Sequence, residues 1–316
     1  MNSHLICAVI VTFNPDLDLF LRQLMSLVKQ VDLIVVVDND SKNIDQIELL
    51  LNSDNLKDIL DSYLLKNASN VGLGKAQNDG IKLAISKSAT HVLLFDQDSV
   101  LNEGFVDGLI ASEISLRKGG FKVAAVGPTY YNELTGEIYP ITKYIGPFIE
   151  RIQPEDDPIQ ATFLIASGCL ISVDIFDKVG YMNEDLFIDY IDVEWSFRAK
   201  SLGYGVYATP LAKMSHTIGD NRISIFGRTI SVHSPLRRYY LFRNSIYMVK
   251  NPSISIGYKI REVVFNTLRF IVFLVLSNDR GMYFKYSFSG FKDGFKGVVG
   301  RCPHNFNSNI IGANKG

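Results

Sequence analysis

The chain has 316 residues, 47% of them hydrophobic and 21% charged. This length allows one large domain or two modest ones with an ample core, and the composition excludes a low-complexity or repeat protein. The three cysteines, Cys7, Cys169 and Cys302, have neither the spacing of a zinc site nor that of a disulfide framework, which fits a reducing cytosol. The apolar run Leu5–Val11 is too short for a secretory signal.

Charge is distributed unevenly along the chain. Residues 237–316 contain 13 Lys or Arg against 3 Asp or Glu, a net charge of +10, whereas residues 1–236 carry −11. A basic tail on an acidic body predicts an anionic partner for the tail, such as nucleic acid or a cytoplasmic membrane leaflet. A nucleic-acid binder would be expected to spread basic charge over its whole fold, so we expect a membrane surface and no nucleic acid.

Short buried strands alternate with helical stretches through the first 126 residues. The strands are expected at 5–11, 33–37, 62–65, 91–95 and 123–126, and the helices at 17–28, 44–51, 75–88 and 103–117. This alternation predicts an α/β fold with a mostly parallel central sheet and helices on both faces. Asn14 is expected to cap the first helix. Five prolines mark a looser excursion over residues 128–160.

Polar clusters follow three of these strands, at Thr12-Phe13-Asn14, Asp38-Asn39-Asp40 and Asp96-Gln97-Asp98. The carboxyl ends of parallel strands form one ligand-binding edge. Alternation in an extended chain sends Asp96 and Asp98 to the same side, and paired carboxylates suit Mg²⁺ or Mn²⁺ together with a diphosphate. The sequence therefore predicts a nucleotide-linked donor, although an Asp-x-Asp segment is also typical of a solvated turn.

Several further residues each allow two interpretations. Asp38 can bind a ribose or cap a turn. Gly72 and Gly74 allow close approach of a ligand, with Lys75 adding charge, but their spacing is that of neither a P-loop nor a dinucleotide fingerprint. His216 can complete a metal shell or be structural.

The segment 189–195 holds a second acidic cluster. One of Asp189, Asp192 and Glu194 can act as general base, or they can cap the helix that follows. Trp195 can stack on a sugar or fill the core. Arg237, Arg238 and Arg243, set among aromatic residues, suit a diphosphate-bearing amphiphile or nucleic acid.

The stretch 259–277 is too polar to span a membrane. Its longest uninterrupted apolar run, Phe270–Leu276, has seven residues, whereas a spanning helix needs roughly 20. Lys259, Glu262, Asn266 and Arg269 recur on one helical face. Both an interfacial helix and an ordinary buried helix explain this pattern.

The order of these motifs resembles that of the inverting family 2 glycosyltransferases with the GT-A fold. The likeness covers residues 5–250 and includes 11–14, 37–39, 70–72, 96–99 and 189–195. The forms at 95–99, 187–195 and 239–244 look like the rhamnosyltransferase branch of bacterial surface polysaccharide assembly.

The resemblance implies a role for each matching residue. Nucleotide binding falls to Thr12, Phe13, Asn14, Asp38, Asn39, Asn70, Gly72, Lys75, Asp96 and Gln97. A divalent metal would be held by Asp98, with Asp96 and His216. Asp192 aligns with the catalytic base, but Ile191 stands where the family has a second acid, which leaves Asp189 and Glu194 as alternatives. The acceptor would meet Gly168, Cys169, Trp195, Arg243 and Asn244.

We therefore expect a GT-A catalytic domain over residues 1–236, with a nucleotide-sugar half at 1–100 and an acceptor half at 101–236. Residues 237–316 would be a helical, membrane-associating tail. The expected enzyme is metal-dependent and moves L-rhamnose from dTDP-L-rhamnose to a lipid-linked glycan in O-antigen and lipopolysaccharide biosynthesis, as a peripheral protein on the inner face of the membrane. Alternatives are a UDP-sugar donor, a sugar nucleotidyltransferase, and a non-catalytic binding protein of the same fold.

Overall fold

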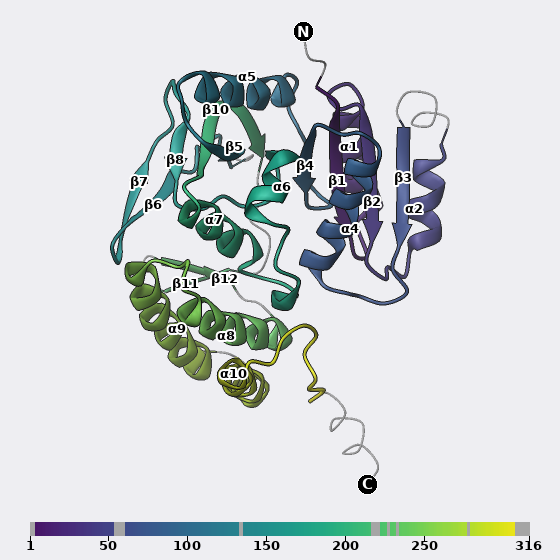
Figure 1. The fold of residues 1–316 in the computed structure, drawn as a ribbon. Coiled ribbons are helices and arrows are strands. Elements are labelled where there is room, and N and C mark those ends of the chain that lie inside the picture. Colours follow the sequence, from purple (N-terminus) through teal and green to yellow (C-terminus); the bar gives the residue numbers. More distant parts are fainter. Residues whose placement is uncertain are drawn as a thin grey trace.

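The computed structural model describes residues 4–53, 61–132, 135–215, 222–225, 228–231, 234–276 and 279–306. Its centre is an eight-stranded sheet with the order β3-β2-β1-β4-β9-β5-β10-β8 (Figure 1). Helices cover both faces of this sheet, which confirms the predicted α/β fold with a mostly parallel sheet.

The first half of the sheet is wholly parallel. β1 (Ile6–Thr12) lies between β2 (Leu33–Asp38) and β4 (His91–Phe95), and β3 (Asp61–Lys66) forms the edge beside β2. Every residue of β1, β2 and β4 is buried, as expected of continuous apolar strands that are covered on both faces. The predicted strands are confirmed here, each to within a few residues.

The second half of the sheet mixes directions. β5 (Val123–Tyr131) pairs in parallel with β10 (Gly205–Ser215). β9 (Cys169–Ser172) runs antiparallel between β4 and β5, and β8 (Ile159–Ala161) is antiparallel on β10. The proline-rich excursion contains a hairpin of β6 (Ile141–Ile145) and β7 (Phe148–Ile152).

Two apolar layers hold the helices on the sheet. On one face pack α1 (Leu17–Leu27), α2 (Ile44–Leu51) and α5 (Phe105–Lys118). On the other pack α4 (Leu73–Ser86), α6 (Asp174–Val179) and α7 (Ile191–Ser201), with a 3-10 turn η1 (Glu184–Leu186) before α7. Successive residues of β1 point to opposite faces of the sheet. Ile10 therefore packs in the layer with α1, α2 and α5, and Val9 packs in the layer with α4, α6 and α7.

The prediction that Asn14 caps α1 is wrong. Asp16 occupies the cap, and its Oδ1 accepts hydrogen bonds of 3.0 Å from the backbone N–H groups of Asp18 and Leu19. Asn14 instead accepts a bond from the backbone N–H of Lys42, at 2.9 Å. Its side chain therefore joins the loops after β1 and β2.

A helical section follows a short hairpin of β11 (Arg222–Ile225) and β12 (Arg228–Ser231). It comprises α8 (Pro235–Lys250), α9 (Ile256–Leu276) and α10 (Arg280–Lys296). These helices lie together at one end of the molecule, drawn in green to yellow in Figure 1. Among the described residues, no helix has the length and apolarity needed to cross a membrane.

The middle of the polar stripe of α9 faces inward, while Lys259 is half-buried and Arg269 is exposed. Glu262 and Asn266 are buried against the rest of the protein. Large apolar side chains of α9, such as Ile260, Val263 and Leu268, are exposed. This arrangement reverses the usual pattern of a helix on the surface of a soluble protein.

Candidate active site

The polar ends of β1 and β2 lie side by side and are joined by hydrogen bonds. Thr12 and Asp38 are paired in register, and Thr12 Oγ1 donates to Asp38 Oδ1 at 3.0 Å. The other carboxylate oxygen of Asp38 accepts the backbone N–H of Ser41 at 2.9 Å. The Ser41 hydroxyl in turn accepts the backbone N–H of Asn14 at 2.7 Å. Asp38 is thereby held in one orientation at the strand end.

The loop after β4 belongs to the same edge. The backbone N–H of Phe13 donates to Gln97 Oε1 at 2.7 Å, while the Phe13 ring is half-exposed. This bond brings the loop carrying Asp96 and Asp98 beside the ends of β1 and β2. The structure thus confirms that the three polar clusters share one edge of the sheet.

Asn39 connects this edge to the loop before α4. Its Nδ2 donates to Asn70 Oδ1 at 3.1 Å, and its Oδ1 accepts the backbone N–H of Val71 at 2.9 Å. Lys75, at the start of α4, forms an ion pair with Asp79 one turn further along the same helix. Gly72 has a φ of 91° and lies against Phe187. The close approach that its missing side chain allows is therefore an approach to Phe187.

Asp96 and Asp98 are both accessible to solvent at the end of β4. Surrounding protein nevertheless removes water from Asp96, and this loss, together with the charges of Asp98 and Asp192 and against the opposing charge of Arg237, raises its pKa to about 6. The backbone N–H of Asp96 donates to Ser167 Oγ at 3.1 Å. Three carboxylates from two distant segments therefore act on one another across this site.

Asp192 lies in the first turn of α7, and its side chain is partly buried. Its Oδ1 accepts the backbone N–H of Val193 at 2.8 Å. Burial raises its pKa to about 6, helped by the nearby charge of Asp189 and opposed by backbone N–H groups, including that of Ala166. A carboxylate of this kind is poised to exchange a proton near neutral pH.

The two alternative bases are engaged elsewhere. Asp189 receives a bidentate contact from Arg237, with N···O distances of 2.9 to 3.2 Å. Glu194 is buried and pairs with Arg198 through bonds of 3.0 and 2.9 Å. These ion pairs favour Asp192 as the carboxylate that is open to a substrate.

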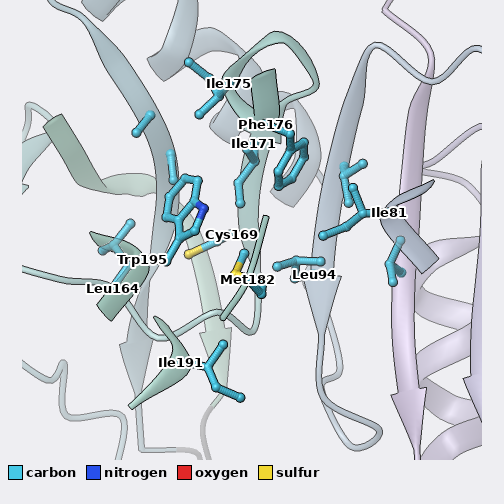
Figure 2. Close-up of a cluster of buried hydrophobic side chains, with 14 of the residues drawn as sticks. Ile81, Leu94, Leu164, Cys169, Ile171, Ile175, Phe176, Met182, Ile191 and Trp195 are labelled. Carbon is cyan, nitrogen blue, oxygen red and sulfur yellow. The ribbon is translucent and has the colours of Figure 1, made fainter. Parts of the chain in front are cut away.

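Two of the predicted acceptor residues near Asp192 are buried rather than open to a substrate. Trp195 and Cys169 are buried in the core shown in Figure 2, where they line a small pocket together with Asp192. Trp195 Nε1 donates to the Gly180 carbonyl at 2.8 Å, and burial raises the pKa of the Cys169 thiol. Gly168 has a φ of 81° and donates its N–H to the Leu94 carbonyl at 2.7 Å.

The other predicted acceptor residues, Arg243 and Asn244, are buried in α8. Their polar atoms face carbonyl groups of the segment before α7. These contacts point to a structural role. His216 lies outside the described residues.

Sequence reasoning did not predict the supporting contacts of three side chains. Ser41 and Ser167 support the loops that carry the polar clusters. Tyr190 connects the turn before α7 with Glu262 of α9. These hydroxyl side chains carried no signal of their own, because in loops they resemble ordinary turn residues, although Glu262, the partner of Tyr190, belongs to the polar stripe.

Asp96 and Asp98 suit a divalent cation because their mutual repulsion, visible in the raised pKa of Asp96, would be relieved by it. Among the described residues, no group of three His, Cys, Asp or Glu side chains is arranged to hold a metal ion. Mg²⁺ often binds through one or two carboxylates and completes its shell with water and substrate phosphates. The pair therefore fits a cation that a diphosphate helps to hold.

Comparisons with known proteins give matches to a family model, to other protein sequences and to solved structures. Residues 7–180 match the family model described as glycosyl transferase family 2. The chain is 33% identical over 308 residues to the dTDP-rhamnosyl transferase RfbF of Shigella flexneri, covering 96% of this chain and 100% of the relative. It is also 26% identical over 176 residues to an uncharacterized protein of Mycobacterium tuberculosis, covering 54% of this chain and 60% of that protein.

Solved structures show the same fold. S. aureus TarS superimposes with a TM-score of 0.57 at 16% identity, covering 93% of this chain and 49% of that chain. The 1–349 fragment of TarS, in complex with UDP-GlcNAc, gives 0.53 at 13% identity, with 93% and 81% coverage.

The fold, together with the family match and the 33% identical relative, defines an enzyme that transfers a sugar. The chain belongs to glycosyl transferase family 2 and is a glycosyltransferase.

Proposed function

We propose that this enzyme transfers L-rhamnose from dTDP-L-rhamnose to a hydroxyl of a lipid-linked glycan, with inversion at the anomeric carbon. The donor follows from identity over nearly the whole chain to a dTDP-rhamnosyl transferase. The observation that carries the chemistry is that Asp96, in the loop after β4, interacts both with Asp98 and with Asp192 of α7. Bacterial O-antigen and lipopolysaccharide assembly is the proposed setting.

Asp192 acts as the general base. In this role it removes the proton of the acceptor hydroxyl as that oxygen attacks the anomeric carbon and the nucleoside diphosphate leaves. Its pKa of about 6 leaves it ionised at neutral pH while it remains basic enough to accept a proton. A single displacement of this kind inverts the anomeric carbon.

Thr12, Asp38 and the neighbouring loops hold the nucleoside, and Asp96 and Asp98 would hold a divalent metal. A divalent metal, when bound, neutralises charge that develops on the leaving diphosphate. Arg237 adds positive charge close to Asp96. These groups explain how a diphosphate is held at an edge that is otherwise acidic.

A donor screen tests this function. Calorimetry with dTDP-L-rhamnose, a UDP-sugar and a GDP-sugar, each with Mg²⁺ and without it, should show the tightest metal-dependent binding for dTDP-L-rhamnose. Tighter binding of a UDP-sugar would transfer the proposal to that donor. Product analysis excludes a nucleotidyltransferase if dTDP, rather than pyrophosphate, is released.

The enzyme is proposed to work at the inner face of the cell membrane, docked by α9 and α10. Exposed apolar residues continue from α9 onto α10, where they include Phe284, Phe288, Phe291 and Phe295. Exposed Lys285, Lys292 and Lys296 flank them. Asp293, the acid of α10, is buried and accepts a hydrogen bond from Tyr239. An apolar stripe with a basic border fits an anionic bilayer.

A further inference from the structure

The turn that leads into α7 has an unusual backbone. Phe187, Asp189 and Tyr190 have φ values of 63°, 63° and 66°, although none of them is glycine. A residue with a side chain is destabilised in the left-handed region, because its Cβ atom lies too close to the following carbonyl oxygen. Such a run persists only where the surrounding structure determines it. The contacts that hold this turn are therefore informative about the site that follows it.

The principal support comes from α8. Asn244 is 1% exposed, and its side-chain amide donates to backbone carbonyls just before and within the strained turn. These are the carbonyls of Leu186 at 2.9 Å, Ile188 at 2.8 Å and Asp189 at 3.2 Å. Arg243 orients the amide by donating from Nε to Asn244 Oδ1 at 2.9 Å. Its terminal nitrogen also donates to the Leu186 carbonyl, at 2.8 Å.

α9 provides a second support through Glu262 and Asn266, the buried part of its polar stripe. The Tyr190 hydroxyl donates a hydrogen bond to the Glu262 carboxylate. Asn266 Nδ2 donates to the same carboxylate at 2.7 Å. Burial raises the pKa of Tyr190, so its hydroxyl keeps the proton that it donates. Glu262 and Asn266, whose helix the sequence allowed to be either interfacial or buried, thus hold Tyr190, the residue two positions before Asp192.

The opposite side of the turn meets the loop before α4. A Cβ atom on Gly72 would lie 2.7 Å from Phe187 Cδ2 and 2.8 Å from its carbonyl oxygen. The backbone N–H of Leu73 donates to that carbonyl at 2.6 Å. The turn is therefore enclosed between the donor side of the molecule and the C-terminal helices.

We propose that Asn244 and Glu262 are positioning residues that hold the turn Phe187–Tyr190 and thereby place Asp192 for proton removal. The inference rests on the proposed role of Asp192 as base. Tyr190 is the N-terminal cap residue of α7, so a relaxed turn would move the first helical turn and its carboxylate. A displacement of about 1 Å at a reacting group can lower a rate roughly 10²-fold.

Asn78 offers a matched control for Asn244. It is equally buried, at 1% exposed. Its side chain also holds backbone in place, because it accepts from the N–H of Met182 and donates to the carbonyl of Met182, both at 2.9 Å. Asn244→Ala and Asn78→Ala should therefore lower Tm by similar amounts. Only Asn244→Ala removes the bonds that hold the strained turn itself.

The assay follows release of dTDP from dTDP-L-rhamnose, with water standing in for the acceptor hydroxyl. Asn244→Ala should lower kcat at least about tenfold and change donor Kd by less than about twofold. Asn78→Ala should keep kcat within about threefold of the wild type. Equal losses of kcat in the two variants, or wild-type kcat in Asn244→Ala, would overturn the inference.

A second pair of variants keeps the test decisive if Asn244→Ala does not fold. Glu262→Gln keeps an oxygen that accepts from Tyr190, so it should retain kcat, whereas Glu262→Leu should lose it with an unchanged donor Kd. Similar kcat in these two variants would contradict the role of Glu262. Wild-type turnover in Asp192→Asn would instead reject the base assignment, which is a distinct failure.

Discussion

Thr12 and Asp38 are joined by a 3.0 Å hydrogen bond across the paired ends of β1 and β2, with both side chains almost completely buried. The bond fixes one oxygen of Asp38, and the backbone N–H of Ser41 fixes the other. A carboxylate constrained in this way is preorganised, so that little side-chain entropy is lost when it accepts a ligand.

Asp38→Ala should weaken binding of dTDP at least about tenfold, because it removes the proposed nucleotide contact and leaves a buried hydroxyl and N–H without their acceptor. Calorimetry with dTDP measures this change. Asp32→Ala is the control, because Asp32 accepts the backbone N–H of Ile6 at the opposite end of β1. Comparable loss of dTDP affinity in both variants would exclude a specific role for Asp38.

Asp192→Asn should abolish most transfer and stabilise the fold at neutral pH. The folded-state pKa of about 6 exceeds the ordinary value of 3.8, so the folded protein binds this proton more tightly than the unfolded chain. Stability is therefore lost as pH rises from about 4 to 6, and the cost, roughly 1–3 kcal/mol, remains above that range. Thermal melts at pH 7.5 should show a higher Tm than the wild type.

The same melts at pH 4 check the sign, because the difference between Asp192→Asn and the wild type should shrink there. Glu194→Gln provides the contrast, since it breaks the buried pair with Arg198 and should lower Tm at pH 7.5. A lower Tm for Asp192→Asn at pH 7.5 would contradict the raised pKa.

The rate should fall below about pH 6. If the ionised form of Asp192 is the base, kcat decreases by up to about tenfold per pH unit on the acid side of its pKa. A pH profile of kcat at saturating donor measures this limb. Asp192→Asn should lose it, and an unchanged acid limb in that variant would assign the titration to another group.

Asp98→Ala should remove most of the effect of Mg²⁺ on donor binding, because the remaining carboxylate, Asp96, would hold the cation alone. Calorimetry with dTDP-L-rhamnose, in Mg²⁺ and in EDTA, gives the comparison. The wild type should bind more tightly in Mg²⁺, and the variant should bind about equally in both. A wild type indifferent to EDTA would refute the metal assignment.

The paired substitution Phe288→Glu and Phe295→Glu should reduce flotation with anionic vesicles, because both rings are more than half exposed on α10. Phe148→Glu is the control: this ring is 74% exposed but lies on the β6–β7 hairpin. Loss of flotation in the control alone would place the membrane contact on that hairpin. Full flotation of the paired variant would reject docking through α10.

The sequence was sufficient for the elements whose periodicity is local. Continuous apolar runs predicted β1, β2 and β4, and polar residues at their ends predicted a shared edge. The antiparallel insertion of β9 between β4 and β5 could not be predicted, because strand order depends on contacts between segments that are about 75 residues apart.

Side-chain roles were harder to predict than elements. Arg243 and Asn244 have the residue types of an acceptor site, but they use their donors on carbonyl groups of the protein. Backbone carbonyl groups have the same chemistry at every position, so the sequence does not reveal which of them these two side chains contact. Likewise, the spacing of polar residues along α9 predicts that they share a face, but not that this face meets Tyr190.

The contact between Gly72 and Phe187 has a consequence for engineering new sugar specificity. Chimeras that exchange the N-terminal half among family members would have to carry a residue without a side chain at this position, or the grafted loop would push against the turn. Shortened versions that end before α8 would lack Asn244. The loop before α4 and the C-terminal helices thus both contact this turn, and libraries for altered glycan synthesis should vary both.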